Sequence, residues 1–112
     1  MGDQIKSSGM NVTPREVELA LESYPEVGLA FVSGVPHPDR GEDVVAAVVP
    51  APGSRVQGEE LRARLATELS SYKVPRHIEV FADRSELPWL DSGKLDLRRL
   101  KALLADRWQR SR

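Results

Sequence analysis

The chain has 112 residues, of which 40% are hydrophobic and 29% charged, and these proportions are typical of a single globular domain. Sixteen basic and 17 acidic residues give a formal net charge of −1 and aromatic residues make up only 5%, so the composition argues against a nucleic-acid-binding protein. The absence of cysteine excludes disulfides and thiolate metal sites and fits a reducing cytoplasm, where we expect the protein; no apolar run approaches the ~20 residues that span a membrane.

Two short extended segments and a helix are predicted at the N-terminus. Residues 3–12 form two extended pieces around a Ser-Ser-Gly turn. Thr13 is placed to cap the helix that follows, with Pro14 at its first position and Glu16 completing a capping box. Apolar residues then recur at helical spacing until Pro25, which ends the helix.

The middle of the chain predicts a buried β-hairpin. Residues 27–35 and 43–49 are rich in apolar and β-branched residues, and residues 36–41 between them have the composition of a turn. Because these runs are almost continuously apolar, we expect both faces of the hairpin to be covered.

Two more helices and a third strand complete the predicted fold. Leucines at four-residue steps predict an amphipathic helix over 59–69, and residues 77–81 alternate as a strand does. The last helix follows Asp96, a suitable N-cap, and its apolar spacing continues to Trp108. The predicted fold class is therefore α+β: a small three-stranded sheet flanked by helices and preceded by a short two-stranded N-terminal hairpin.

Lys94 is the main candidate for a catalytic residue. It ends the run Leu-Pro-Trp-Leu-Asp-Ser-Gly-Lys at 87–94, just before the last helix. A lysine on an exposed turn is a mobile charge with three donors, suited to oxygens that gather negative charge during a reaction. Taken alone, a lysine here is more often a solvated surface residue. A P-loop is rejected, because its first glycine would fall at Pro88 and no Ser or Thr follows the lysine.

A second candidate site lies in the N-terminal turn. Lys6 precedes the Ser-Ser-Gly sequence, and a lysine on a short surface strand is usually only solvated. Gly9 marks a position where the backbone needs a positive φ or a close approach, which a tight turn alone would explain.

Other polar residues do not form a site in the sequence. His37 and His77 lie apart without neighbouring ligands, so neither is predicted to bind a metal or to act as a general base. Glu16 and Glu18 are not a catalytic carboxylate pair, since one is expected to cap the helix and the other to face solvent. The C-terminal basic cluster is too small for a nucleic-acid arm and suits a helix dipole: Arg107, Arg110 and Arg112.

Three motifs, in order, resemble the C-terminal "lid" domain of the adenylate-forming enzymes. They are Asp-Gln-Ile-Lys-Ser-Ser-Gly-Met-Asn-Val at 3–12, Tyr-Lys-Val-Pro at 72–75 and Leu-Pro-x-x-x-Ser-Gly-Lys at 87–94. This superfamily includes acyl-CoA synthetases, peptide synthetase adenylation domains and luciferase, and the chain is most similar to bacterial acyl-CoA synthetases of the fatty-acid or aryl-acid type. It departs from the usual pattern at Trp89 and Leu90, where polar residues are usual, and at Met10.

The resemblance implies a single C-terminal lid domain over residues 1–112, cut at a hinge near residues 1–3, with Gly2 as the pivot before Asp3. The large N-terminal domain that binds ATP and the acid would be absent from the chain. ATP, CoA and Mg²⁺ would therefore belong to the complete enzyme, and we expect the isolated domain to bind none of them and to be inactive.

The activity implied by the resemblance is that of an AMP-forming acyl-CoA synthetase, an acid–thiol ligase. Lys94 would serve the first step, in which a carboxylic acid and ATP give acyl-adenylate and pyrophosphate. After a rotation of the lid, Lys6 and the loop of Ser8, Gly9 and Met10 would serve transfer of the acyl group to CoA or a carrier-protein thiol. The partner would be the enzyme's own N-terminal domain. The alternative is a stand-alone lid-like module that binds a partner or carrier protein without catalysis.

Overall fold

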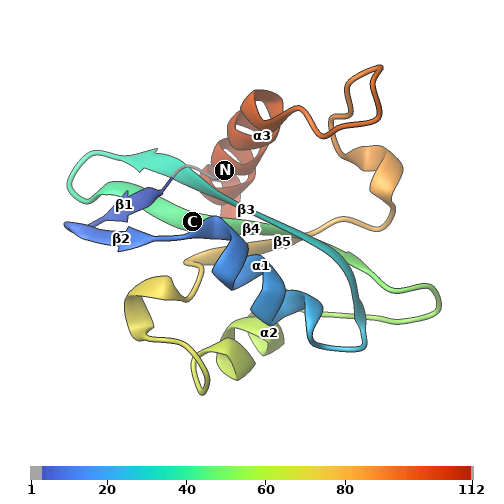
Figure 1. The fold of residues 1–112 in the computed structure, drawn as a ribbon, viewed down its shortest axis with the longest axis horizontal. Coiled ribbons are helices and arrows are strands. Elements are labelled where there is room, and N and C mark those ends of the chain that lie inside the picture. Colours follow the sequence, from blue (N-terminus) through green and yellow to red (C-terminus); the bar gives the residue numbers. More distant parts are fainter. Residues whose placement is uncertain (1–3, 112) are drawn as a thin grey trace.

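The computed structural model describes residues 4–111, which form one mixed sheet with helices on both faces (Figure 1). The element order is β-β-α-β-β-α-β-α, as the sequence predicts, with a 3₁₀ turn on each side of the last strand. The strands are β1 (Ile5–Ser7), β2 (Met10–Val12), β3 (Val27–His37), β4 (Gly41–Pro50) and β5 (His77–Val80). The helices are α1 (Pro14–Glu22), α2 (Gly58–Leu65) and α3 (Leu97–Ser111), and the 3₁₀ turns are η1 (Ser71–Lys73) and η2 (Arg84–Glu86). None of the helices within 4–111 is long and apolar enough to cross a membrane.

The sheet is centred on β4. Strand β3 pairs with it antiparallel along most of its length, and β5 pairs with its other side in parallel, over residues 45–48 of β4. The β1–β2 hairpin joins β4 through the pair Ser7–Gly41. The predicted three-stranded sheet is confirmed, and the N-terminal hairpin extends it to five strands instead of standing apart.

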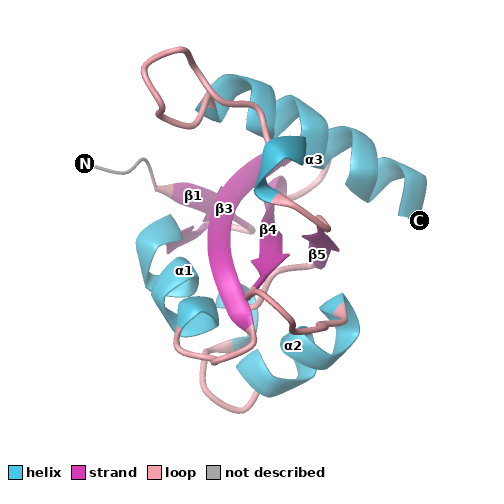
Figure 2. Cartoon of the chain, turned by 90° about the vertical axis from the view of Figure 1, so that its right-hand side faces the viewer, coloured by secondary structure: helices cyan, strands magenta, loops and turns pink. Residues whose placement is uncertain are grey.

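Strand β4 is buried on both faces, as its unbroken apolar run predicts. Figure 2 shows α1 and α2 on one side of the sheet and α3 on the other. Successive residues of β4 point to alternate faces and belong to two separate hydrophobic clusters. Val44, Ala46 and Val48 pack with α1 and α2, whereas Val45, Ala47 and Val49 pack with α3.

The start of α1 differs from the sequence prediction. Thr13 is the N-cap residue, but its side chain makes no capping hydrogen bond; it accepts one from Gln4 Nε2 at 2.9 Å. Glu16 Oε2 accepts a hydrogen bond from Lys73 Nζ at 2.9 Å. The predicted capping box is therefore wrong, because both of its side chains are engaged by residues distant in sequence.

Glu18 and several element ends also differ from prediction. Glu18 was expected to face solvent, but its Oε2 accepts a hydrogen bond from the backbone N–H of Val32 on β3 at 3.0 Å, and only 16% of its side chain is exposed. Helix α2 ends at Leu65 instead of continuing to residue 69, and β3 and β4 both extend further towards their connecting turn. The longer strands follow from backbone pairing, which requires no apolar side chain.

Gly58, at the start of α2, lies against β5. A Cβ atom on this residue would come 2.5 Å from the backbone oxygen of Ile78, which is closer than two such atoms can approach. We expect Gly58→Ala to lower the free energy of unfolding by about 1–3 kcal/mol, because α2 must move away from the sheet. Urea unfolding measures this loss, with Glu60→Ala at an exposed position of α2 as the control. Equal stability of the two variants would contradict the close approach.

Candidate functional site

Lys94 lies at the end of a tight loop that precedes α3. Trp89 and Leu95 form an antiparallel bridge at its base. Within the loop, the N–H of Leu90 donates to the Lys94 carbonyl at 2.7 Å, and the N–H of Gly93 donates to the Leu90 carbonyl at 2.9 Å. Gly93 has a φ of +91°, which glycine adopts without steric cost. The loop fixes the backbone of Lys94 and leaves its side chain exposed, and the ammonium has no hydrogen-bond or ion-pair partner within residues 4–111.

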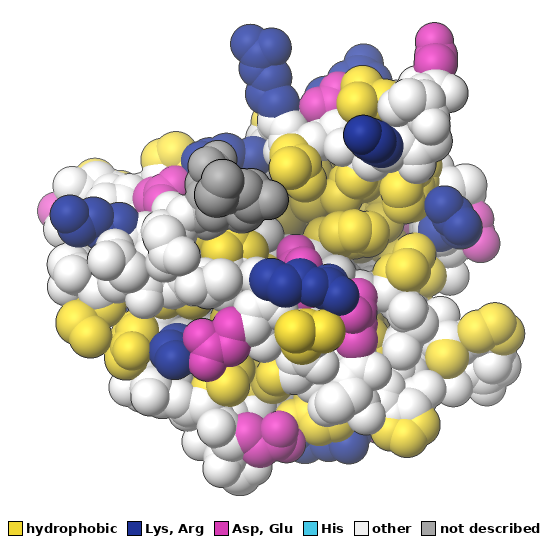
Figure 3. Space-filling model, in the orientation of Figure 1, with side chains coloured by type: hydrophobic (Ala, Val, Ile, Leu, Met, Phe, Trp, Pro, Cys, Tyr) yellow, Lys and Arg dark blue, Asp and Glu magenta, His cyan; other side chains and the backbone are white. Residues whose placement is uncertain are grey.

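Trp89 anchors this loop to the body of the domain. Its indole N–H donates to the Arg84 carbonyl at 2.8 Å, and the Arg84 guanidinium lies 4.6 Å from the ring centroid. The ring meets Phe31 of β3 edge to face, with the centroids 6.2 Å apart. Figure 3 shows hydrophobic side chains gathered in this region of the surface. Sequence reasoning treated Trp89 only as a departure from the family pattern and missed this anchoring contact.

The N-cap predicted for α3 is confirmed. Asp96 Oδ1 accepts a hydrogen bond from the backbone N–H of Arg99 at 3.1 Å, and the Asp96 N–H donates to the Pro88 carbonyl at 2.8 Å. The base of the Lys94 loop is thus joined directly to the first turn of α3.

Lys6 and Gly9 lie in the β1–β2 hairpin, where Lys6 pairs with Asn11. Ser8 and Gly9 form its two-residue turn, with φ values of +52° and +81°, and turns of this kind need positive φ at both positions. The conformation predicted for Gly9 is confirmed, and a Cβ there would meet nothing within 4 Å, so backbone shape explains the glycine. Met10 is 44% exposed. The Lys6 side chain is also exposed, and in the described part of the chain its ammonium has no partner.

The two candidate lysines are not brought together. Figure 1 shows the β1–β2 hairpin on one side of the molecule and the loop between η2 and α3 on the other. A hollow of about 800 Å³, lined mainly by residues 49–57 and 82–84, borders neither lysine. The structure therefore divides the candidate residues into two separate places. The proposed hinge residues Gly2 and Asp3 lie outside the described residues.

The Tyr-Lys-Val-Pro motif at 72–75 makes structural contacts. The hydrogen bond from Lys73 Nζ to Glu16 raises the pKa of Lys73 and ties η1 to α1. Arg62 of α2 donates from Nε to the Pro75 carbonyl at 2.8 Å. These contacts join the motif to α1 and α2, so its observed role is structural.

The two histidines have protein partners. His37 Nδ1 accepts two backbone N–H groups of the turn that follows it, each at 3.1 Å. His77 Nε2 lies 2.7 Å from Glu79 Oε1, and the His77 ring stacks on Trp108 with centroids 5.4 Å apart. Within 4–111, no group of three or more histidine, aspartate and glutamate side chains is arranged to hold a metal ion.

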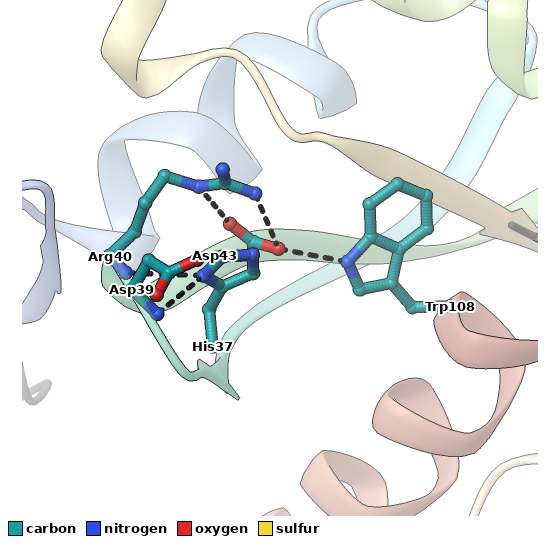
Figure 4. Close-up of polar contacts among 5 residues, drawn as sticks. All are labelled: His37, Asp39, Arg40, Asp43 and Trp108. Atoms are coloured by element: carbon teal, nitrogen blue, oxygen red, sulfur yellow. Dashed lines mark hydrogen bonds and ion pairs between the residues drawn. The ribbon is translucent and has the colours of Figure 1, made fainter.

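A buried carboxylate on β4, missed by sequence reasoning, pairs with an arginine of the preceding turn and binds the C-terminal half of α3 (Figure 4). Asp43 is fully buried and accepts hydrogen bonds from Arg40 Nε at 3.0 Å and from Trp108 Nε1 at 2.9 Å. Burial raises the pKa of Asp43, but the hydrogen bonds from Arg40 and Trp108 outweigh it and lower the pKa below its usual value. The sequence contained one indication of a buried carboxylate, because Asp43 directly precedes a run of six apolar residues.

We expect Asp43→Asn to lower the free energy of unfolding by about 1.5–3 kcal/mol at neutral pH, because the charged acceptor of the hydrogen bonds from Arg40 and Trp108 is lost. A carboxyl group with a lowered pKa stabilises the fold above its unfolded pKa of about 3.9, and this stabilisation is lost as the pH falls through the folded value. The difference between wild type and variant should therefore be constant near neutrality and shrink below about pH 4.

Urea unfolding from pH 7 to pH 3 measures the Asp43 effect, with Asp39→Asn as the control. Asp39 is an exposed residue of the turn that precedes β4 and undergoes the same chemical change. A stability difference that does not depend on pH would contradict a role for the Asp43 charge.

The sheet with helices on both faces, together with the loop that ends in Lys94, defines a lid-type α+β domain. The chain belongs to the AMP-binding enzyme C-terminal domain family, whose model matches residues 16–94 and ends at that lysine. The family recognised from the three sequence motifs is thereby confirmed. The matched region begins after the β1–β2 hairpin, so the assignment of Lys6 rests on its own motif.

Relatives of the chain are acyl-CoA synthetases and ligases. It is 52% identical over 93 residues to a feruloyl-CoA synthase of an Amycolatopsis species and 43% identical over 98 residues to a long-chain-fatty-acid–CoA ligase of Bacillus subtilis. The matches cover 83% and 88% of this chain but only 18% and 17% of those proteins, so the chain spans less than a fifth of their length.

Solved structures give the same result. The fold superposes on ATP-bound MatB from Rhodopseudomonas palustris with a TM-score of 0.83 and 30% identity, and on an acyl-CoA synthetase from Brucella canis with a TM-score of 0.79 and 38% identity. Each match covers 95% of this chain and 20% of the longer chain.

Proposed function

We propose that this chain is the mobile C-terminal domain of an AMP-forming acyl-CoA synthetase. The observation that carries the proposal is an exposed lysine, unpartnered within residues 4–111, on a hydrogen-bonded loop at the end of the matched family region. The enzyme would join a carboxylic acid to ATP, releasing pyrophosphate, and then transfer the acyl group to CoA or a carrier-protein thiol, releasing AMP. The names of the relatives support an aryl or fatty acid as the substrate.

Lys94 acts in the first half-reaction. A carboxylate oxygen of the acid attacks the α-phosphorus of ATP. The new P–O bond forms the acyl-adenylate, and the bond between the α-phosphorus and the pyrophosphate oxygen breaks. The Lys94 ammonium stabilises the charge on the carboxylate and α-phosphate oxygens during this transfer. The hydrogen bonds of Trp89 and Asp96 hold the base of the loop in place, so that less conformational entropy is lost when the domain closes.

Lys6 and the turn of Ser8, Gly9 and Met10 act in the second half-reaction. The thiolate sulfur attacks the acyl carbonyl carbon, and AMP leaves with the bonding electrons of the C–O bond. Since the hairpin and the Lys94 loop lie on different sides of the domain, the domain must rotate between the two steps (Figure 1). Closure in each state excludes water and protects the reactive adenylate.

The remaining chemistry belongs to an N-terminal domain, which is the partner of this chain. We assign Mg²⁺ to the ATP phosphates and that domain, and derive no step from it. Gly2 and Asp3 form the hinge between the domains. The isolated chain is accordingly inactive, and we place the complete enzyme in the cytoplasm.

The test separates the two half-reactions in the full-length enzyme, using ferulic acid and a long-chain fatty acid as trial substrates. Exchange of pyrophosphate into ATP reports adenylation, and thioester formation from supplied acyl-adenylate reports transfer. If Lys94→Ala leaves exchange unchanged, the proposal fails and a non-catalytic binding module becomes the better description.

A further inference from the structure

The β1–β2 hairpin, which carries Lys6, has a narrow attachment to the rest of the sheet. Each of its strands has three residues, and its pairing with β4 is the single pair Ser7–Gly41. A two-stranded hairpin of this size is marginally stable on its own. The orientation of Lys6 therefore depends on contacts from outside the hairpin.

Ile5 and Val12 are buried in the core cluster with α1 and α2, and Glu42 supplies a polar contact to Lys6 itself. Glu42 Oε1 accepts a hydrogen bond from the backbone N–H of Lys6 at 3.2 Å, and its Oε2 accepts one from Lys101 Nζ on α3 at 3.1 Å. The carboxylate thus bridges the hairpin and the helix that directly follows the Lys94 loop. A neighbouring contact, from the Ser8 N–H to the Arg40 carbonyl at 2.8 Å, holds the turn of the hairpin.

Two glycines make room for this arrangement. Gly41 has a φ of +84°, and a Cβ on it would lie 3.1 Å from the Lys6 carbonyl oxygen, so glycine permits the close approach of β1. Gly34 on β3 lies under the Glu42 carboxyl group. A Cβ there would come within 2.8 Å of the Glu42 carboxyl carbon and Oε2, in the space that the carboxylate now occupies.

We propose that Glu42 is a positioning residue for Lys6: it fixes the backbone of the hairpin so that the Lys6 ammonium meets the acyl-adenylate when the thiol attacks. This inference rests on the proposed function and adds a residue that the family motifs do not single out. Glu42 touches neither substrate nor reacting atoms. Its loss therefore misplaces Lys6, whereas Lys94 stays in place through the contacts of Trp89 and Asp96 in its own loop.

The primary test measures both half-reactions in the full-length enzyme carrying Glu42→Ala. We expect thioester formation from supplied acyl-adenylate and CoA to slow about tenfold, because small misplacements of a catalytic group are costly, while pyrophosphate exchange stays within about twofold of wild type. Glu42→Gln should restore most of the rate, since its amide oxygen can still accept the Lys6 N–H. Glu60→Ala, which removes an exposed glutamate of α2, is the matched control and should change neither step.

A second variant displaces the carboxylate without removing it. Gly34→Ala places a methyl group where the Glu42 carboxyl lies and should slow the same step selectively. In the double variant the two effects should not add, because both act through one contact. Hydrogen exchange of full-length enzyme, followed in peptides covering residues 4–12, should be faster in Glu42→Ala than in Glu42→Gln.

The outcomes separate this inference from the proposed function. If Lys6→Ala slows thioester formation but Glu42→Ala does not, or if Glu42→Ala slows both half-reactions equally, the positioning role is wrong and the function stands. Unchanged hairpin exchange in Glu42→Ala also overturns it. If Lys94→Ala leaves pyrophosphate exchange unchanged, the proposed function itself fails, and the positioning role, which rests on it, fails with it.

Discussion

Replacing Lys94 with alanine in the full-length enzyme should slow adenylate formation by two to four orders of magnitude, equivalent to about 3–5 kcal/mol at the transition state. The ammonium is exposed and unpartnered within residues 4–111, and its loop is fixed through Trp89 and Asp96. Its loss should therefore remove a preorganised charge without disturbing the fold. Pyrophosphate exchange into ATP measures the effect.

Two comparisons make this result specific to Lys94. Thioester formation from supplied acyl-adenylate should remain close to the wild-type rate, because we propose that this step uses the hairpin on the other side of the domain. Arg98→Ala removes another exposed cation near the start of α3 and should alter neither step. An equal loss in Arg98→Ala would mean that the general charge of this surface, and not Lys94, supports adenylation.

Much of the fold could be predicted because the core pattern is local. The apolar run at 44–49 indicates a strand covered on both faces, and its alternate residues indeed pack with α1 and α2 or with α3. The attachment of the hairpin could not be predicted in the same way. The hairpin's apolar residues Ile5 and Val12 are buried in the core. Its pairing with β4, however, is made by Ser7 and Gly41, which are far apart in sequence and carry no apolar signal.

The errors at α1 have a common physical cause. Thr13, Glu16 and Glu18 each satisfy a local rule for a helix start or an exposed helix face, yet all three bind residues elsewhere in the fold. A side-chain hydrogen bond to a partner distant in sequence competes with a local cap of similar energy. The spacing of residues along the helix predicts the local cap but contains no information on a hydrogen-bond partner that is distant in sequence.

The candidate site was predictable as motifs but not as geometry. Lys94 and Gly9 were found from short, ordered sequence patterns, and the positive φ of Gly9 followed from its turn. The supporting contacts of Trp89 and Asp43 were not found, because Trp89 packs on Phe31 and Asp43 binds Trp108, both distant in sequence. Motifs identify exposed functional residues, whereas the contacts that hold them depend on the completed fold.

Lys6→Ala should produce the reverse pattern to Lys94→Ala. Thioester formation from supplied acyl-adenylate should slow by about 10²–10³-fold, the usual effect of removing one stabilising donor, while pyrophosphate exchange is retained. The positive charge of Lys6 would offset the charge that develops on the carbonyl oxygen and the departing AMP phosphate as the thiolate attacks. Rapid-quench measurement with acyl-adenylate and CoA tests this, since it excludes adenylation from the observed rate.

Asn11→Ala is the matched control for Lys6→Ala, because Asn11 is the exposed residue paired with Lys6 across the same hairpin. If both variants slow thioester formation equally, the hairpin contributes shape and the lysine has no separate role. If Lys6→Ala alone slows it and Lys94→Ala alone slows exchange, each lysine serves one half-reaction. Because the two lysines lie on different sides of one domain, that division of roles requires the domain to present a different side to the same bound adenylate in each step (Figure 1).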